Sequence, residues 1–252
     1  MELEGVSPAR GRRYAVLLCA EDSEHVKRKY GGYFGVFVSL LGEEGDAWAV
    51  YRVAAGEFPG EEEIRAVDGF VLTGSCNDAH GDDPWIRQLL GLLRRLVEMK
   101  KKILGVCFGH QILCRALGGK TGRSATGWDI GVTTIEMLPP SKQLSSFKLP
   151  ASLQVIECHQ DEVTELPLKA EVMGKSGKTG VEMFRYGEHA MGIQGHPEYT
   201  KDILLHLIER LEAKKCITAE YAEAMRARAA EGEPDREAWR KLCTSFLKGS
   251  LW

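Results

Sequence analysis

The amino-acid sequence predicts an α/β protein with a mainly parallel sheet and an antiparallel section in its second half. Short apolar runs alternate with segments of helical spacing through roughly the first 120 residues, as in βαβ units. These runs are continuously apolar, which is typical of parallel strands buried on both faces. From about residue 128 to residue 195, strand-like segments follow one another without intervening helices, which favours antiparallel or mixed pairing.

Four strands and the helices between them are expected in the first half. Each strand is a short apolar run, and we place them at residues 14–20, 47–53, 69–73 and 102–106. Helices are expected where apolar residues recur at helical spacing, at 32–42, 85–99 and 112–117. A short acidic helix is expected to begin between residues 59 and 65.

The second half divides into strand-like segments and a helical end. Strands are expected at 132–135, 153–156, 171–173, 180–185 and 190–194. Helices are expected at 202–214, 218–230 and 235–247, the last two separated by Gly232 and Pro234. We therefore expect a disordered N-terminus at 1–13, one domain at 14–212 and a C-terminal helical extension at 213–252.

Composition excludes several classes of protein. The 252 residues are 44% hydrophobic with a formal net charge of -3, which fits a compact globular domain and does not favour nucleic acid or an anionic membrane as partner. The seven cysteines are odd in number and include no Cys-x-x-Cys pair, which argues against a disulfide framework and a structural zinc site. No signal peptide or membrane span is apparent, so a cytosolic location is expected.

Three Gly-Lys-Ser/Thr triplets could be mistaken for a phosphate-binding loop. They begin at Gly119, Gly174 and Gly177. Such a loop needs another glycine five positions earlier, and these positions hold Cys114, Lys169 and Val172. We therefore predict no nucleotide site, and the sequence suggests neither a metal nor a cofactor.

A candidate nucleophile lies in the segment Gly105-Val-Cys-Phe-Gly109. An apolar strand leads into this segment and a helix is expected to follow, which is the setting of a Gly-x-nucleophile-x-Gly elbow with cysteine as nucleophile. The flanking glycines relieve crowding at a sharp turn, and the helix N-terminus favours a thiolate and can hold an oxyanion. The alternative is that Cys107 is a small buried core residue, as free cysteines usually are.

A cysteine nucleophile needs a base and a group that orients the base. His196 ends an apolar run and is followed by Pro197 and Glu198. In extended chain, residues two apart point to the same side, so the Glu198 carboxylate could fix the imidazole. The alternative is a strand end with a surface glutamate. His110 is interpreted as packing or solvent-facing, whereas His159 follows a strand in what we interpret as a polar loop. The other histidines, His25, His80, His189 and His206, have no supporting pattern.

Two motifs together resemble the class I glutamine amidotransferase family. Residues 105–111 and 196–198 match its pattern Gly-x-Cys-x-Gly-x-Gln followed later by His-Pro-Glu, with about 90 residues between them. Residues 72–75 resemble the family's oxyanion loop. Residues 158–163 resemble its Ser-His-x-Asp-x-Val segment, with Cys158 in place of serine. The resemblance covers roughly residues 14–212.

The resemblance implies a flavodoxin-like doubly wound sheet and a set of site residues. It implies that Cys107 is the nucleophile, His196 the general base and acid, and Glu198 the orienting carboxylate. The amides of Gly74 and Phe108 would form the oxyanion hole. The residues implied to meet the substrate are Gln111, His159, Gln160 and Asp161.

Within the family, the chain looks most similar to plant cytosolic gamma-glutamyl peptidases. The similarity extends to residues 29–34, 74–78, 116–120 and 127–131. It implies a small-molecule substrate, glutathione or a glutathione S-conjugate, whose gamma-glutamyl amide bond is hydrolysed through a thioester. No nucleic acid or membrane partner is implied, and no oligomeric state is predicted.

Other functions stay open at this stage. A glutaminase subunit would use the same chemistry and pass ammonia to a separate synthase. A non-catalytic regulatory module could keep the fold without the reaction, and a redox-sensing thiol is a further alternative. The segment 213–252 could dock on the domain or mediate assembly.

Overall fold

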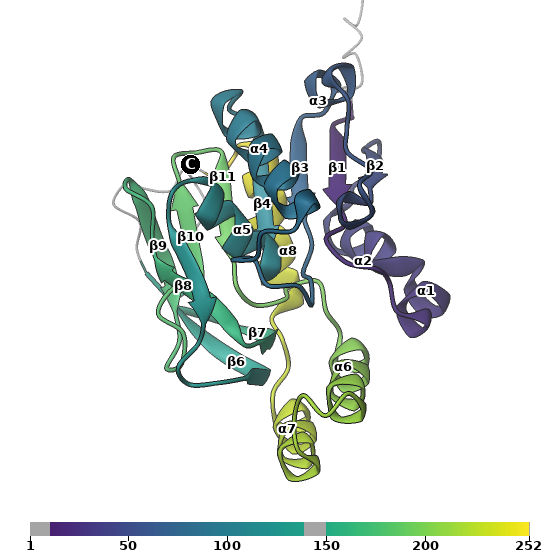
Figure 1. The fold of residues 1–252 in the computed structure, drawn as a ribbon, viewed down its shortest axis with the longest axis vertical. Helices are drawn as coiled ribbons and strands as arrows, with labels where there is room; N and C mark the ends of the chain where they lie inside the picture. Colours follow the sequence, from purple (N-terminus) through teal and green to yellow (C-terminus); the bar gives the residue numbers. More distant parts are fainter. Residues whose placement is uncertain (1–10, 139–149, 252) are drawn as a thin grey trace, which may run out of the picture.

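The computed structural model describes residues 11–138 and 150–251, which form a nine-stranded mixed sheet and a two-stranded one (Figure 1). The strand order of the large sheet is β2-β1-β3-β4-β11-β10-β9-β6-β7. Its first five strands pair in parallel: β2 (Ala47–Tyr51), β1 (Arg13–Leu17), β3 (Gly69–Leu72), β4 (Lys102–Val106) and β11 (Ala190–Ile193). The expected α/β class and mainly parallel core are confirmed.

The other strands pair antiparallel, as the second half of the sequence predicts. In the large sheet they are β10 (Met183–Tyr186), β9 (Ala170–Lys175), β6 (Asp129–Met137) and β7 (Ser152–His159). A separate ribbon pairs β5 (Lys120–Arg123) with β8 (Asp161–Glu165). The mixed sheet therefore joins a parallel core to an antiparallel extension at β11.

Helices cover both faces of the parallel core, as Figure 1 shows with α4 and α5 in front of β4 and α8 behind it. One hydrophobic cluster joins the sheet to α2 (Gly32–Leu41) and α8 (Arg236–Lys248). A second joins the opposite face to α3 (Glu61–Ala66), α4 (Pro84–Glu98) and α5 (Phe108–Ala116). A 3-10 turn, η1 (Val53–Ala55), follows β2. This is the doubly wound arrangement.

A third hydrophobic cluster lies beyond the carboxyl ends of the parallel strands. It joins α1 (Glu24–Tyr30), α6 (Lys201–Ala213) and α7 (Ala219–Glu231) to β6 and β7 through Ile130 and Ile156. Figure 1 shows α6 and α7 projecting below the sheet. Ligand sites in open α/β sheets form at this carboxyl edge, so these helices border the expected site.

Three sequence expectations need correction. The helix expected at 112–117 begins at Phe108, directly after Cys107. The short helix α1 was not predicted; Ser23 caps it by accepting a hydrogen bond from the Val26 amide. The expected polar loop around His159 is instead the end of β7 and the start of β8. A strand with one buried face tolerates alternating polar residues, and Asp161 and Val163 are its buried positions.

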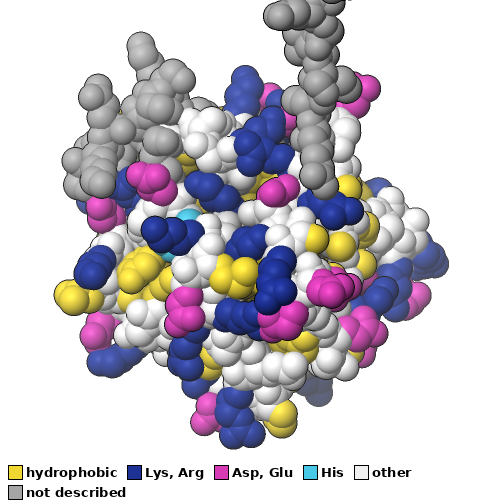
Figure 2. Space-filling view, turned by 90° about the horizontal axis from the view of Figure 1, so that it is seen from above, with side chains coloured by type: hydrophobic (Ala, Val, Ile, Leu, Met, Phe, Trp, Pro, Cys, Tyr) yellow, Lys and Arg dark blue, Asp and Glu magenta, His cyan; other side chains and the backbone are white. Residues whose placement is uncertain are grey.

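Charged side chains of both signs are interspersed on the face that Figure 2 shows. This agrees with the small net charge of -3. In the described ranges, no helix combines the length and the apolar composition needed to cross a bilayer.

The C-terminal helix α8 packs inside the main core. Trp239, Leu242 and Phe246 are fully buried among sheet residues and α2. The Trp239 indole also donates a hydrogen bond of 3.0 Å to the Gln154 carbonyl at β7. The helix is therefore held by apolar burial and by a direct bond to the sheet.

Replacement of Trp239 by alanine should destabilise the whole domain. We expect the free energy of unfolding to fall by about 3–5 kcal/mol, because the change leaves a large cavity in the core. Urea unfolding measures this, with Leu205→Ala, at a side chain 39% exposed, as control. Equal stability of the two variants would contradict the packing described for α8.

Candidate active site

Cys107 occupies the sharp turn between β4 and α5. Its backbone angles are φ 54° and ψ -108°, a conformation that residues other than glycine seldom adopt. A Cβ on Gly105 would lie 2.4 Å from the Gly109 carbonyl oxygen, and one on Gly109 would lie 2.6 Å from that of Leu72. Only glycine permits these backbone approaches, so the flanking glycines are needed for the elbow that the sequence predicted.

His196, which lines the same pocket as Cys107, forms a buried pair with Glu198. His196 Nδ1 lies 2.8 Å from Glu198 Oε1, and the residues are 2% and 1% exposed. The imidazole stacks on the Tyr199 ring with centroids 3.8 Å apart, and the His196 amide donates to the Ile156 carbonyl at 2.7 Å. Position and ring orientation are thus both fixed, so the other ring nitrogen is left for the thiol.

The charge of His196 is set by its neighbours. Burial lowers its pKa, but the Glu198 carboxylate and the Cys107 thiol outweigh this and raise the pKa to about 10. The imidazole is therefore protonated at neutral pH and loses its charge only as the pH rises through that value. An imidazolium beside a thiol favours the thiolate, which is the nucleophilic form.

Gly74 lies against the catalytic candidates, where an oxyanion hole was expected. A Cβ there would lie 2.8 Å from His196 Cε1 and 3.7 Å from Cys107 Cβ. The Thr73 hydroxyl donates to the Gly74 carbonyl at 3.1 Å and accepts from the Cys19 amide at 3.0 Å, which holds the loop. Phe108 is the first residue of α5, so its amide has no partner within the helix. The fold brings both predicted donors to the nucleophile.

The residues that we expected to meet substrate all line this pocket: Gln111, His159, Gln160 and Asp161. The Gln111 amide nitrogen is already engaged, donating to the Asp161 carbonyl at 2.8 Å and to Gln194 Oε1 at 3.0 Å. His159 Nδ1 lies 2.9 Å from the Asp161 carbonyl oxygen, and its Nε2 points to Glu157 at 3.3 Å. These polar groups therefore hold the pocket wall together.

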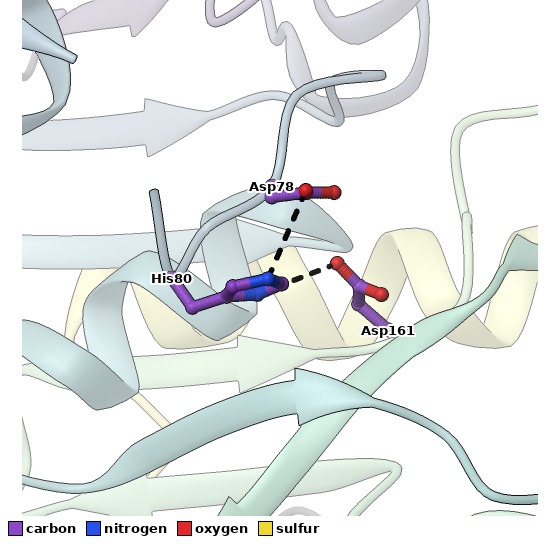
Figure 3. Close-up of side chains that lie close together, drawn as sticks. All are labelled: Asp78, His80 and Asp161. Atoms are coloured by element: carbon purple, nitrogen blue, oxygen red, sulfur yellow. Dashed lines mark ion pairs between the residues drawn. The ribbon is translucent and has the colours of Figure 1, made fainter. Parts of the chain in front are cut away.

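One end of the pocket carries side chains of both charges. Arg123 lies 3.2 Å from an Asp78 carboxylate oxygen and 3.0 Å from one of Asp161. His80 lies between the two carboxylates, 3.7 Å from each (Figure 3). Of these residues only Asp161 could be predicted as a site residue from the sequence, because residues 78, 80 and 123 belong to segments that meet it only in the fold.

A second end of the pocket is bordered by one face of α6. Leu207, Arg210, Leu211 and Lys214 line it at spacings of three and four residues, with Trp128 beside them. In the part of the chain that the structure describes, neither Arg210 nor Lys214 has an ion-pair partner. The helical pattern of 202–214 was visible in the sequence, but it did not indicate which face borders a site.

His110 has a packing role, as expected. It is fully buried beside the Phe184 ring at a centroid distance of 5.0 Å, and burial lowers its pKa to about 3. The imidazole is therefore neutral at physiological pH and faces the core.

Replacement of Glu198 by glutamine should change the pH dependence of the rate at which Cys107 is alkylated. Loss of the carboxylate lowers the pKa of His196, so the imidazolium that favours the thiolate is lost at neutral pH. The rate at which iodoacetamide alkylates Cys107 reports this change when the unmodified protein and the variant are compared over a range of pH. In Glu198→Gln it should be roughly tenfold or more slower at pH 7 and should rise with pH.

Mass spectrometry of the Cys107 peptide measures these rates. Cys216 is exposed and lies outside this pocket, so its alkylation in the same sample serves as internal control. Identical pH profiles of Cys107 in both proteins would show that Glu198 does not set the charge of His196.

Comparisons with known proteins agree with this fold. Residues 48–208 match the family model described as Glutamine amidotransferase class-I. Gamma-glutamyl peptidase 5 of Arabidopsis thaliana is 48% identical, with 94% of this chain and 96% of the relative covered. Gamma-glutamyl peptidase 3 of the same plant is 46% identical, with 94% and 97% covered.

A solved glutamine amidotransferase of Thermotoga maritima superposes with a TM-score of 0.71 at 23% identity, and the match covers 95% of this chain and 99% of that one. At that identity the likeness concerns the fold. The sequence relatives and the family model decide the classification: the chain belongs to the class I glutamine amidotransferase family.

Proposed function

We propose that this chain is a cysteine-dependent gamma-glutamyl peptidase that hydrolyses the gamma-glutamyl amide bond of glutathione or its S-conjugates. The observation that carries the proposal is the elbow thiol of Cys107 in one pocket with the buried His196–Glu198 pair. The names of the plant relatives support a gamma-glutamyl hydrolase role. The two ends of the pocket support the glutathione-like substrate.

The proposed reaction proceeds through a thioester. The Cys107 thiolate attacks the gamma-carbonyl carbon, and the amides of Gly74 and Phe108 donate hydrogen bonds to the resulting oxyanion. By analogy with other oxyanion holes, each donor stabilises the transition state by about 3 kcal/mol. His196 gives its proton to the leaving amine as the C–N bond breaks. It then takes a proton from water, whose oxygen attacks the thioester and releases glutamate and the thiolate.

The end of the pocket with both charges suits the gamma-glutamyl group. That group carries an alpha-ammonium and an alpha-carboxylate, so it needs acceptors and a cation close together. Asp78 and Asp161 offer carboxylates, and Arg123 offers a guanidinium between them. Substrate binding there would replace contacts of Arg123 with Asp78 and Asp161 by charge-assisted hydrogen bonds from these side chains to the substrate's carboxylate and ammonium groups.

The α6 end of the pocket suits the leaving group. Cysteinylglycine ends in a carboxylate, and Arg210 and Lys214 are cations on the pocket wall without a partner among the described residues. Leu207, Leu211 and Trp128 add apolar surface beside them, which suits a substituent on the cysteine sulfur. Ammonia, the leaving group of a glutaminase, would use neither feature.

Product analysis tests the proposed function directly. Purified protein given glutathione or an S-conjugate should release glutamate and a cysteinylglycine product, and Cys107→Ala should lose this activity. Cys216→Ala, which removes an exposed thiol outside the active-site pocket, is the matched control. Ammonia from glutamine alone would favour a glutaminase subunit, and no product from any substrate would contradict a hydrolase.

Replacement of Arg210 by methionine tests the leaving-group end. We expect the KM for glutathione to rise roughly tenfold with little change in kcat, because a charge-assisted contact to the glycine carboxylate is lost. The glycine ethyl ester of glutathione lacks that carboxylate, so its KM should be unchanged. The control is Arg94→Met, at an exposed arginine on α4. Equal effects on both substrates would place the glycine carboxylate elsewhere.

A further inference from the structure

Behind the wall of the active-site pocket, three potential metal ligands meet in the interior. Glu157 and His159 come from β7, and Glu182 directly precedes β10. One ligand atom from each lies within 4.8 Å of those of the other two. Glu157 and Glu182 are fully buried, and His159 is 5% exposed.

These side chains lack the hydrogen bonds that buried polar groups normally make. Within the described residues, none of the four carboxylate oxygens of Glu157 and Glu182 makes a hydrogen bond of good geometry, and neither does His159 Nε2, although the two carboxyl groups lie close to each other and the Ser176 hydroxyl lies close to Glu182. His159 Nδ1 lies 2.9 Å from the Asp161 carbonyl oxygen, which accepts only if Nδ1 carries the proton. In the neutral ring, this leaves the lone pair of Nε2 directed at Glu157 Oε2, 3.3 Å away.

That arrangement is the usual one for a histidine that binds a metal. Such a histidine donates its other ring N–H to a carbonyl or carboxylate, which fixes the tautomer and the ring orientation. We infer that Glu157, His159 and Glu182 form a buried site for a divalent transition-metal cation, with Zn²⁺ as the best match. The inference is independent of the substrate of Cys107.

Charge balance supports a dication. Two ionised glutamates beside a neutral histidine carry a charge of -2, and isolated carboxylates in a protein interior are costly. Arg228 lies 3.1 Å from Asp129, so the nearby guanidinium is already engaged. Without a cation the carboxyls hold protons: burial and Asp129 raise the pKa of Glu157, and burial and Glu157 raise that of Glu182 to about 9.

The donor set distinguishes between metals. Two carboxylates and one imidazole suit zinc and its transition-metal neighbours, whereas Mg²⁺ and Ca²⁺ prefer oxygen donors alone. A second oxygen of one glutamate or a water can complete four-coordination. The turn at 176–180 passes close to Glu182 and carries exposed Gly177 and Gly180, so little protein separates the cluster from solvent there.

The group of Asp78, His80 and Asp161 in Figure 3, of which only Asp161 is buried, is a weaker candidate. Arg123 already contacts both of its carboxylates, at 3.2 and 3.0 Å. A cation there would have to displace the guanidinium, whereas the buried group has no such competitor among the described residues.

The experiment uses Cys107→Ala protein, so that the catalytic thiol cannot bind the metal. After exposure to Zn²⁺ and removal of loosely bound metal, we expect one zinc per chain by elemental analysis. We also expect a thermal midpoint several degrees above that of the metal-free protein. Calorimetry at pH 7 should show proton release on binding, because zinc displaces protons from the carboxyls.

Variants in the same background locate the site. Glu182→Gln should lose the zinc and the thermal shift, whereas Glu136→Gln, at an exposed glutamate of β6, and His80→Gln should keep both. If the Cys107→Ala protein retains no zinc, the inference is overturned, and the two buried carboxyl groups are instead neutralised by protons that they share. Zinc that persists in Glu182→Gln or disappears in His80→Gln would overturn it in favour of another location.

A spectroscopic measurement keeps the test decisive if Glu182→Gln does not fold. Zinc-edge X-ray absorption of the Cys107→Ala protein should show nitrogen and oxygen neighbours that include an imidazole, and no sulfur. Sulfur neighbours would assign the metal to other cysteines and overturn the inference.

Discussion

The close approach of backbones at the elbow is the constraint on which the site depends. Gly105 and Gly109 let α5 begin within van der Waals contact of β3 and β4, and this forces Cys107 into its unusual backbone conformation. The helix N-terminus then points its free amides at the place where the thiol lies. Gly74, on the loop after β3, completes the arrangement, because a side chain there would collide with the His196 ring. The residues proposed as nucleophile, base and oxyanion donors are thus fixed by contacts that only glycine permits.

Two buried carboxyl groups, those of Glu157 and Glu182, lie directly beneath this arrangement. The His196 amide is bonded to the carbonyl of Ile156, and the next residue along β7 is Glu157. A Cβ on Gly195 would lie 2.4 Å from Glu157 Oε1, so the loop that carries His196 rests on the buried carboxylate. Burial in a low dielectric strengthens the His196–Glu198 pair and penalises the uncompensated Glu157 and Glu182. Desolvation therefore acts against the charge of His196, which the Glu198 carboxylate maintains, and it favours binding of protons or a cation at Glu157 and Glu182.

The sequence predicted best what depends on neighbours in the chain. Continuous apolar runs identified the parallel strands, and the elbow could be recognised because its strand, glycines and helix are consecutive. The pairing of His196 with Glu198 was likewise local. In contrast, Glu157 and Glu182 are 25 residues apart and would each pass for a surface glutamate, because only the fold shows that both are buried. A polar loop was predicted where β8 lies, because the strand has mostly polar residues and only one buried face. Arg123 and Asp78 meet Asp161 through tertiary pairing that no local pattern indicates.

The C-terminal segment shows how distant sequence comes to act on the site. The sequence left docking on the domain and assembly as alternatives for residues 213–252. In the structure, Arg236 at the start of α8 donates to the carbonyls of Glu198 and Tyr199 at 2.6 and 2.7 Å. These two residues orient the His196 ring, one by its carboxylate and the other by stacking. Arg236 can hold them only because α8 is anchored in the core through Trp239, three residues further on. Packing of the buried face of α8 therefore helps to set the orientation of the candidate base, His196. The C-terminal segment thus contributes to the scaffold of the candidate active site.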